Sequence, residues 1–185
     1  MTLPLPATLT PSKISTYTNC ALAFRFSAID RVPEAPSLAA TRGTLVHGAL
    51  EHLLQRPAPE RVPRAGPGSV DAALADRAPP PQFENQRLGG VHFYALLCEQ
   101  VFGRRPAKIQ LLHLADPVAI MTTPSEQSSR GLSRKVSAIW QAVERSCGAE
   151  DFRPRPSRPC DWCSFRQWCS AHGGDPATAP RPETS

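Results

Sequence analysis

The chain of 185 residues lacks long apolar runs and the features of a secretory leader. No stretch approaches the roughly 20 apolar residues that a membrane-spanning helix needs, so no membrane partner is predicted. The opening MTLPLPATLTPSK has neither the basic region nor the apolar region of a signal peptide. These absences favour a cytoplasmic protein, in which thiols stay reduced and spaced cysteines are more typical of metal or cluster ligands than of disulfides.

Motifs of several common enzyme classes are also absent. The sequence has no P-loop, no G-x-S-x-G nucleophile motif and no G-x-G-x-x-G dinucleotide fingerprint. It does have an excess of proline, with 21 residues, and a formal net charge of +5. This charge is compatible with a nucleic-acid partner without requiring one.

The distribution of proline predicts the domain organisation. One domain is expected over residues 9–173, interrupted at 56–81 by a Pro-rich linker in which no strand can be written. Residues 174–185 are also rich in proline and are predicted to be a disordered tail.

Hydrophobic periodicity within the domain predicts more helix than strand. Helices are expected at residues 12–27, 39–55, 82–102 and 125–147. Ser12 and Ser125 are candidate N-caps and Gly103 is a candidate C-cap. One strand is predicted at 107–116, and the segment VAIMTT at 118–123 is a candidate partner in a hairpin.

The stretch PCDWCSFRQWC, residues 159–169, holds three cysteines in the spacing C-x2-C-x5-C. Their three thiolates are one ligand short of a complete tetrahedral site, and His172 would complete a zinc site on Cys160, Cys163 and Cys169. A fourth cysteine from elsewhere would instead complete an iron–sulfur cluster. The candidates for this fourth ligand are Cys20, Cys98 and Cys147. Three unliganded thiols are the remaining alternative.

Four segments, in order, resemble the RecB-family nucleases of the PD-(D/E)XK superfamily. Residues 9–29, LTPSKISTYTNCALAFRFSAI, resemble the family's opening helix, with Ala21 where a proline is usual and Phe24 kept. RGTLVHGALE resembles the next motif, G-x-x-(L/V)-H, through Gly43 and His47. The resemblance covers roughly residues 9–55 and 82–173.

The other two segments lie in the second half of the chain. Tyr94 resembles the end of the Q-x-x-x-Y motif, although Gly90 stands where the glutamine belongs and Gln86 lies one helical turn earlier. The C-terminal C-x2-C-x5-C resembles the segment of AddB-type recombination nucleases that binds a [4Fe–4S] cluster. This similarity implies a truncated α/β core of the PD-(D/E)XK type, mostly helical here, with a C-terminal cysteine-cluster segment.

The resemblance also implies ligands and partners. It assigns a [4Fe–4S] cluster to Cys20, Cys160, Cys163 and Cys169. It makes His47 a Mg²⁺ ligand and places Tyr94 near a DNA phosphate. The implied role is in DNA repair or recombination, with DNA and a helicase or another recombination-complex subunit as partners. Arginines are candidates for contacts with phosphate, namely Arg25, Arg31, Arg42, Arg104 and Arg105.

The catalytic signature of this family is missing. It consists of an Asp and a following (Asp/Glu)-x-Lys, which hold Mg²⁺ and orient the attacking water. The chain has three lysines, and the residues two positions before them are Pro11, Pro106 and Ser133. The strands that should carry the signature are expected to be absent between about Leu74 and Pro79.

A histidine alone is a poor ligand set for Mg²⁺, which prefers carboxylate oxygens, so His47 is not expected to hold the ion. The sequence therefore predicts a nuclease-family protein without nuclease activity. Two alternatives remain: a zinc-stapled module that binds nucleic acid or protein without catalysis, and a non-functional remnant.

Overall fold

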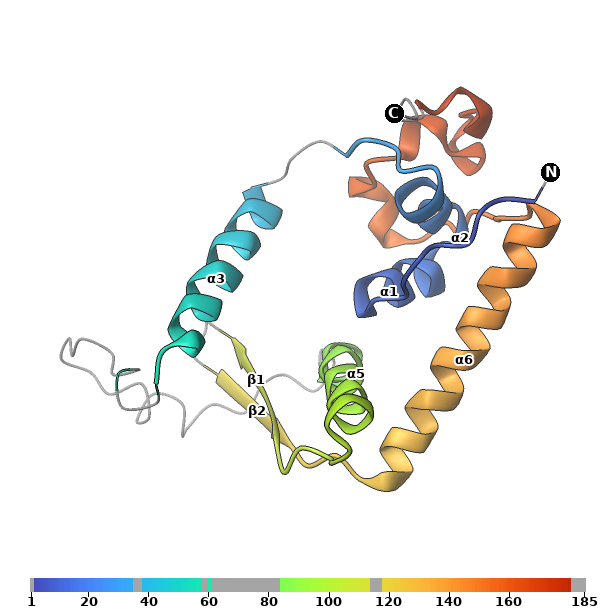
Figure 1. Ribbon diagram of the computed structural model, residues 1–185. Helices are drawn as coiled ribbons and strands as arrows, with labels where there is room; N and C mark the ends of the chain where they lie inside the picture. Colours follow the sequence, from blue (N-terminus) through green and yellow to red (C-terminus); the bar gives the residue numbers. More distant parts are fainter. Residues whose placement is uncertain (1, 35–37, 58–59, 61–83, 114–117, 181–185) are drawn as a thin grey trace. The chain divides into compact units, whose positions relative to one another are not determined.

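A computed structural model describes residues 2–34, 38–57, 60, 84–113 and 118–180 (Figure 1). The chain divides into two compact units. The first comprises Met1–Glu34, Pro79–Leu112 and Ala119–Ser185, and the second comprises Ala35–Ala78 and His113–Val118. Most of the predicted linker at 56–81, including the expected gap near 74–79, lies outside the described residues.

The second unit contains helix α3, Leu38–Gln55, which confirms the helix expected at 39–55. Its leucines at 45, 50 and 53 are exposed. Across the described parts of both units, no helix has the length and apolar character needed to cross a bilayer.

The first unit begins with a broken helix, where the sequence predicted a continuous one at 12–27. Helix α1, Pro11–Asn19, ends at Cys20, whose backbone is extended at φ −160° and ψ 111°. Helix α2, Ala21–Phe24, and a π-helical turn η1, Arg25–Ile29, follow directly. The break turns the chain and brings Cys20 to the junction of two short helices.

The expected N-cap at Ser12 is also corrected. The cap of α1 is Thr10, whose side chain accepts a hydrogen bond from the Lys13 N–H at 3.3 Å. Pro11 then occupies the first helical position, where a missing N–H costs nothing because that group has no partner within the helix.

The core of the first unit is built around α2 and η1. Leu22, Phe24 and Phe26 are all buried, although positions 22 and 24 lie on opposite sides of a helix. The segment is therefore enclosed on both sides. Buried Val143 and Cys147, from the long helix α6, Glu126–Ala149, belong to the same cluster.

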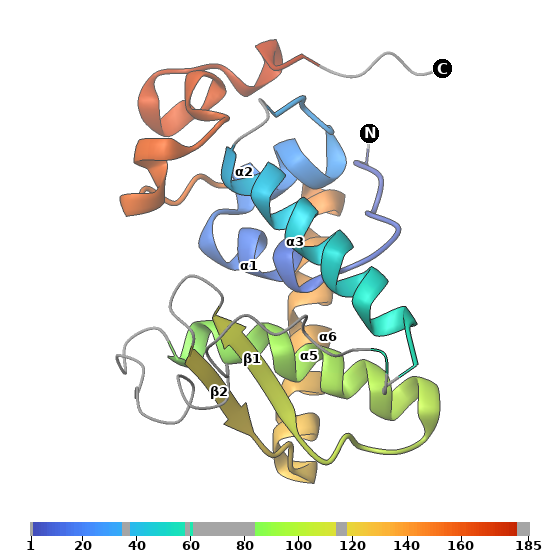
Figure 2. The ribbon, with the colours of Figure 1, turned by 90° about the vertical axis from the view of Figure 1, so that its left-hand side faces the viewer.

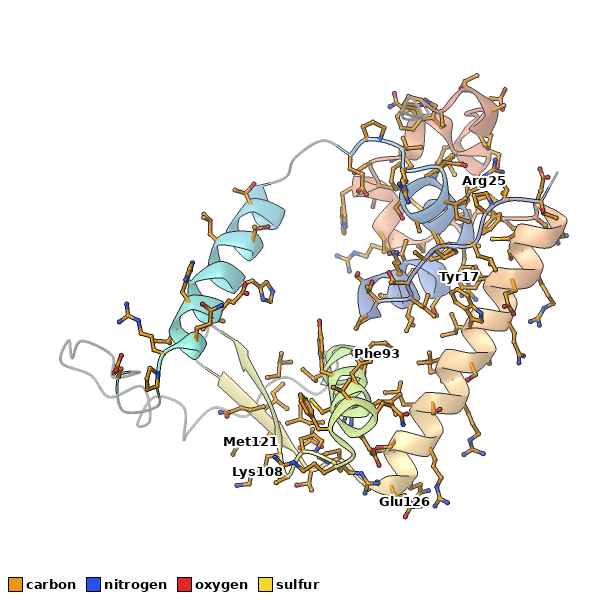
Figure 3. All side chains as sticks on the ribbon, viewed as in Figure 1. Tyr17, Arg25, Phe93, Lys108, Met121 and Glu126 are labelled. Carbon is orange, nitrogen blue, oxygen red and sulfur yellow. The ribbon has the colours of Figure 1, made fainter. Side chains whose placement is uncertain are left out.

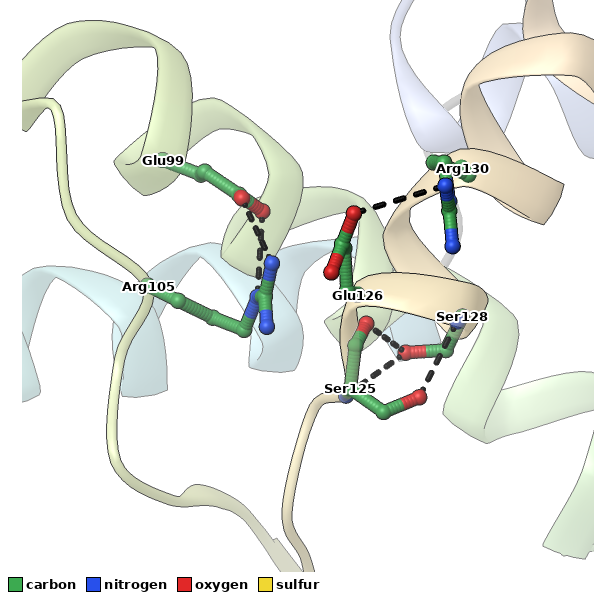
Figure 4. Close-up of polar contacts among 6 residues, drawn as sticks. All are labelled: Glu99, Arg105, Ser125, Glu126, Ser128 and Arg130. Atoms are coloured by element: carbon green, nitrogen blue, oxygen red, sulfur yellow. Dashed lines mark hydrogen bonds and ion pairs between the residues drawn. The ribbon is translucent and has the colours of Figure 1, made fainter.

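Helix α6 confirms the expected helix at 125–147 and its cap. The Ser125 side chain accepts from the Ser128 N–H, and the Ser128 hydroxyl lies within hydrogen-bonding distance of the Ser125 N–H, at 2.9 Å (Figure 4). Near its other end, the Ser146 hydroxyl lies 3.0 Å from the hydroxyl of Tyr17, which points from α1 toward α6 (Figure 3). These contacts hold the N-terminal helices against α6.

Helix α5, Glu84–Phe102, belongs to the first unit, as do residues 109–112 and 119–122 of a short hairpin. Gly103 ends the helix with φ 67°, a left-handed conformation that favours glycine and confirms the predicted C-cap. Strands β1, Ile109–His113, and β2, Val118–Thr122, pair in opposite directions (Figure 2). The hairpin partner is thus confirmed, whereas β1 is shorter than the strand expected at 107–116. The pair is the only sheet in the described part of the chain.

A partly buried ion pair connects α5 to the segment that leads into β1. Arg105 donates from Nη2 to Oε1 of Glu99 at 2.9 Å (Figure 4). Hydrogen bonds from Arg105 and Ser129 hold the pKa of Glu99 below its ordinary value. Because the carboxyl is protonated as the pH falls through that lowered value, this contact is present above the ordinary pKa and is lost in acid.

One face of α5 carries exposed apolar side chains. Tyr94, Leu97 and Val101 follow one another at helical spacing, and all three are exposed. In a complete α/β domain such a face packs against a sheet.

The C-terminal segment consists of short 3₁₀ helices: η4 (Arg158–Trp162), η5 (Arg166–Trp168), η6 (Ser170–His172) and η7 (Pro176–Thr178). Residues 174–180 differ from the disordered tail expected at 174–185. Asp175 accepts from the Ala177 N–H at 2.9 Å, and Ala179 is buried in the core cluster. Residues 181–185 lie outside the description.

Phe24 should contribute strongly to stability, because its side chain is fully buried at 0 % exposure and meets the Tyr17 ring edge-on at 5.2 Å. Replacing Phe24 with alanine should lower the free energy of unfolding by about 3–5 kcal/mol. Phe102, at 69 % exposure, is the matched control, and its replacement should cost about 0.5 kcal/mol or less. Denaturant unfolding measures both, and equal losses would contradict the assignment of the core.

Candidate metal centre

Cysteines from the two ends of the chain line one cavity of about 260 Å³ in the first unit. Cys20 lies at the break between α1 and α2. Cys160 lies in η4, and Cys163 and Cys169 directly follow η4 and η5. Four thiols separated by up to 149 positions in the sequence therefore share one cavity.

The local backbone donates hydrogen bonds to two of these sulfurs. The Ser157 N–H donates to Sγ of Cys160 at 3.3 Å, and the Phe165 N–H donates to the sulfur of Cys163. Such donors stabilise a charged thiolate and are among the groups that tune a sulfur-ligated centre.

Aromatic rings hold the C-terminal segment against the N-terminal helices. The Phe165 ring lies 5.4 Å from that of Phe26, and the Trp168 ring lies 6.5 Å from it on an edge-on approach. Both C-terminal rings are neighbours in sequence of the cavity cysteines. Their packing on η1 therefore fixes the position of the three C-terminal thiols relative to Cys20.

A close backbone approach also shapes the loop that carries Cys169. Gly174 donates its N–H to the Cys169 carbonyl at 2.9 Å. A Cβ at position 174 would overlap the Gln167 carbonyl oxygen and would lie 2.7 Å from the Cys169 nitrogen. Only glycine fits at this point, since the atoms in the way belong to the backbone.

The thiols influence one another electrostatically. Burial raises the pKa of Cys163, and negative charge on Cys20, Cys160 and Cys169 raises it further, while the Phe165 N–H lowers it. Four thiolates in one cavity repel each other, so the ionised form of the set needs a cation or a cationic cluster between the sulfurs.

The spacing of the side chains bears on which group they would hold. Among the described residues, no three His, Cys, Asp or Glu side chains converge closely enough to hold one metal ion. A single zinc requires its four ligand atoms at bonding distance from one point. A four-iron cluster binds each thiolate to a different iron, so its ligands surround a larger centre. His172 also lines the cavity, so the cavity brings together the candidate ligands of both the cluster and the zinc site.

The other two cysteines do not line this cavity. Cys147 is buried in the core, with its sulfur 3.8 Å from the Pro4 carbonyl oxygen, and burial raises its pKa. Cys98 is half-buried on α5. Of the three candidates for a fourth cysteine ligand, only Cys20 lies with the C-terminal set.

The remnants of the catalytic motifs belong to different units of the chain. His47 is exposed on α3 in the second unit, and no set of metal ligands includes it in the part of the chain that is described. Gln86 and Tyr94 belong to α5 in the first unit. Tyr94 is exposed, and the side chain of Gln86 lies outside the description.

The candidate phosphate-binding arginines fall into two groups. Arg25 and Arg105 form ion pairs with Asp30 and Glu99, each at 2.9 Å. Arg31 and Arg104 are exposed, and the side chain of Arg42 lies outside the description. Trp162 was not predicted from the sequence as a functional residue, and it is highly exposed between two of the cavity cysteines. The sequence feature that could have indicated it is a tryptophan in a segment rich in arginine and proline.

Comparison with known proteins identifies a family. The family model of the PD-(D/E)XK nuclease superfamily matches residues 8–89 and 76–170, and the two matched segments overlap at 76–89. Neither a curated protein nor a solved structure matches the chain. Together the two segments cover most of the 185 residues, and the chain belongs to the PD-(D/E)XK nuclease superfamily.

Proposed function

We propose that this protein binds DNA, holds a [4Fe–4S] cluster on Cys20, Cys160, Cys163 and Cys169, and does not itself hydrolyse DNA. The observation that carries the proposal is the shared cavity, which collects these four cysteines from opposite ends of the chain. The cluster would join the N-terminal helices to the C-terminal segment, because its ligands come from both. A RecB-like role in repair or recombination follows from the motifs described above.

The proposed loss of catalysis rests on the missing acidic groups and lysine. Hydrolysis in this superfamily requires carboxylates that hold Mg²⁺ and a lysine that positions water. No (Asp/Glu)-x-Lys occurs in the chain. The two segments that match the family overlap at 76–89, close to the point near 74–79 where we expect the strands that carry it to be missing. The exposed stripe on α5 further supports an incomplete sheet.

Such a protein would act by binding rather than by cleavage. A cytoplasmic partner that supplies motor or nuclease activity, such as a helicase or another subunit of a recombination complex, would complete the function. The alternative is a zinc-stapled binding module on Cys160, Cys163, Cys169 and His172. It is supported by the place of His172 at the cavity, but it gives no role to Cys20, which lines the same cavity.

The test is a combined binding and cleavage assay on labelled linear DNA with Mg²⁺, using anaerobically purified protein. We expect binding that weakens with salt, because contacts with phosphate release counterions, and no metal-dependent cleavage. His47→Ala should behave like wild type in both assays. Cleavage that requires Mg²⁺ and disappears in His47→Ala would show that a working catalytic site exists, and absence of binding would refute the proposal of DNA binding.

A further inference from the structure

Trp162 stands out among the aromatic residues of the described chain. Its side chain is 71 % exposed at the end of η4, between Cys160 and Cys163. The structure records no aromatic ring or hydrogen-bond partner for it among the described residues. By contrast Trp168, six positions on, packs against Phe26, and Trp140 donates its N–H to Glu144 at 2.8 Å. Because tryptophan is highly buried on average, this exposed indole is a candidate contact residue.

The backbone that carries Trp162 is well constrained. Ser157 caps η4, and Pro159 fixes a dihedral angle in its first turn. The Cys160 N–H donates to the Ser157 carbonyl at 2.9 Å, and the Cys163 N–H donates to the Cys160 carbonyl at 3.4 Å. The ring is therefore presented on a short, braced helix, which lowers the entropy lost when a ligand packs on it.

Arginines surround Trp162 in the sequence. Arg158 begins η4, is exposed, and has no recorded partner in the described part of the chain. Arg166 is half-exposed and makes only a long ion pair of 3.9 Å with Asp161. Arg155 is exposed and uses one N–H on the Thr18 carbonyl at 3.2 Å, which leaves its other donors free. In the sequence, three guanidinium groups thus accompany one exposed ring. Two carboxylates oppose this charge, that of Asp161 and that of Glu34, which lines the same cavity.

Exposed tryptophan and arginine occur both in protein interfaces and in nucleic-acid sites. A protein interface needs an apolar core of several side chains. Here Trp162 is the only large apolar side chain that is exposed in the described C-terminal segment, since the others are Leu5 and residues of α3, α5 and β2. A single ring among positive charges is instead the arrangement that stacks on a base while cations contact the phosphates.

We propose that Trp162 is a base-stacking platform for single-stranded DNA, with Arg155, Arg158 and Arg166 as its phosphate contacts, at the rim of the four-cysteine cavity. The proposal rests on the DNA binding proposed above and locates it. Single-stranded DNA is the ligand because its bases expose faces that duplex DNA buries in its stack. Trp162 also lines the cavity, so the proposed stacking platform lies at the same cavity as the four cysteines.

The test separates stacking from charge by using two fluorescent strands with the same phosphates. One is oligothymidylate of about 20 nucleotides, longer than typical single-strand site sizes, and the other is an abasic strand of equal length. Fluorescence anisotropy gives the Kd of anaerobically purified protein for each. Wild type should prefer oligothymidylate about tenfold, which is the size of effect that one stacked base supplies.

Trp162→Ala should bind both strands with nearly the same Kd, whereas Trp162→Phe should keep most of the preference for bases. Phe102→Ala removes an equally exposed ring from α5 and should behave like wild type. Circular dichroism and metal content, compared with those of wild type, establish whether each variant is folded. If Trp162→Ala is not folded, the preference of Trp162→Phe for oligothymidylate tests the proposal in its place.

The outcomes distinguish the two proposals. If wild type binds both strands equally, or if Trp162→Ala keeps the wild-type preference, stacking on Trp162 is overturned while DNA binding survives. Trp162 would then be left as a candidate anchor for a protein. If wild type binds neither strand, DNA binding itself is overturned, and the platform with it.

Discussion

Replacing Cys20 with alanine should abolish the metal centre and strongly destabilise the protein. Cys20 is the only N-terminal residue of the four-cysteine set, and the other three lie within ten residues of each other. Its loss would remove the proposed cross-link, which closes about 140 residues of chain. By lowering the entropy of the unfolded chain, such a cross-link stabilises the protein by about 4 kcal/mol or more. Iron and sulfide analysis and thermal unfolding of the anaerobically purified variant measure the two effects.

Cys98→Ala is the matched control for this prediction. Cys98 is also a free, half-buried thiol, but it lies on α5 and does not line the cavity. Its replacement should leave the metal content unchanged. Equal metal content in wild type, Cys98→Ala and Cys20→Ala would contradict the assignment of Cys20 and favour the zinc site that uses His172.

Gly174→Ala should destabilise the protein about as much as Cys20→Ala does, although it changes only the backbone environment. The added methyl would overlap the Gln167 carbonyl oxygen and crowd the Cys169 nitrogen. Relief of these overlaps requires the loop that carries Cys169 to move, at a cost of about 3 kcal/mol or more. We expect loss of both stability and metal, as measured by thermal unfolding and metal analysis, although the substitution alters no ligand.

The control for Gly174 is a glycine with open space around it. Gly131 lies within α6, and a Cβ there would meet nothing within 4 Å. Gly131→Ala should therefore stabilise the protein by about 0.5–1 kcal/mol, because alanine loses less backbone entropy in a helix. A Gly174→Ala variant that is as stable as Gly131→Ala and keeps its metal would show that the close approach at Cys169 is not as described.

Local features of the fold could be predicted from the sequence, because they depend on neighbouring residues. The cap at Ser125 and the turn at Gly103 are examples, since each follows from hydrogen bonding or dihedral preference within one turn. The break at Cys20 could not be predicted in this way. A prediction from periodicity assumes that a helix buries one face. Residues 21–26 are instead packed on both sides by segments that are distant in sequence.

The candidate site shows the same division. The spacing C-x2-C-x5-C indicates a set of three ligands. Spacing alone left three other cysteines as candidates for the fourth ligand, and Cys20 was chosen because of the family motif. The structure separates the three by position, with Cys20 at the cavity, Cys147 in the core and Cys98 on α5. The exposure of Trp162 had no signal in periodicity, because tryptophan is highly buried on average, and Trp168 nearby is half-buried against Phe26.

Metal analysis of the wild-type protein, purified without oxygen, tests the central claim most directly. The four-cysteine cavity predicts about four iron and four acid-labile sulfide per chain, with broad visible absorption and no stoichiometric zinc. A colourless protein with about one zinc per chain and no iron would contradict the cluster and establish the zinc module in its place.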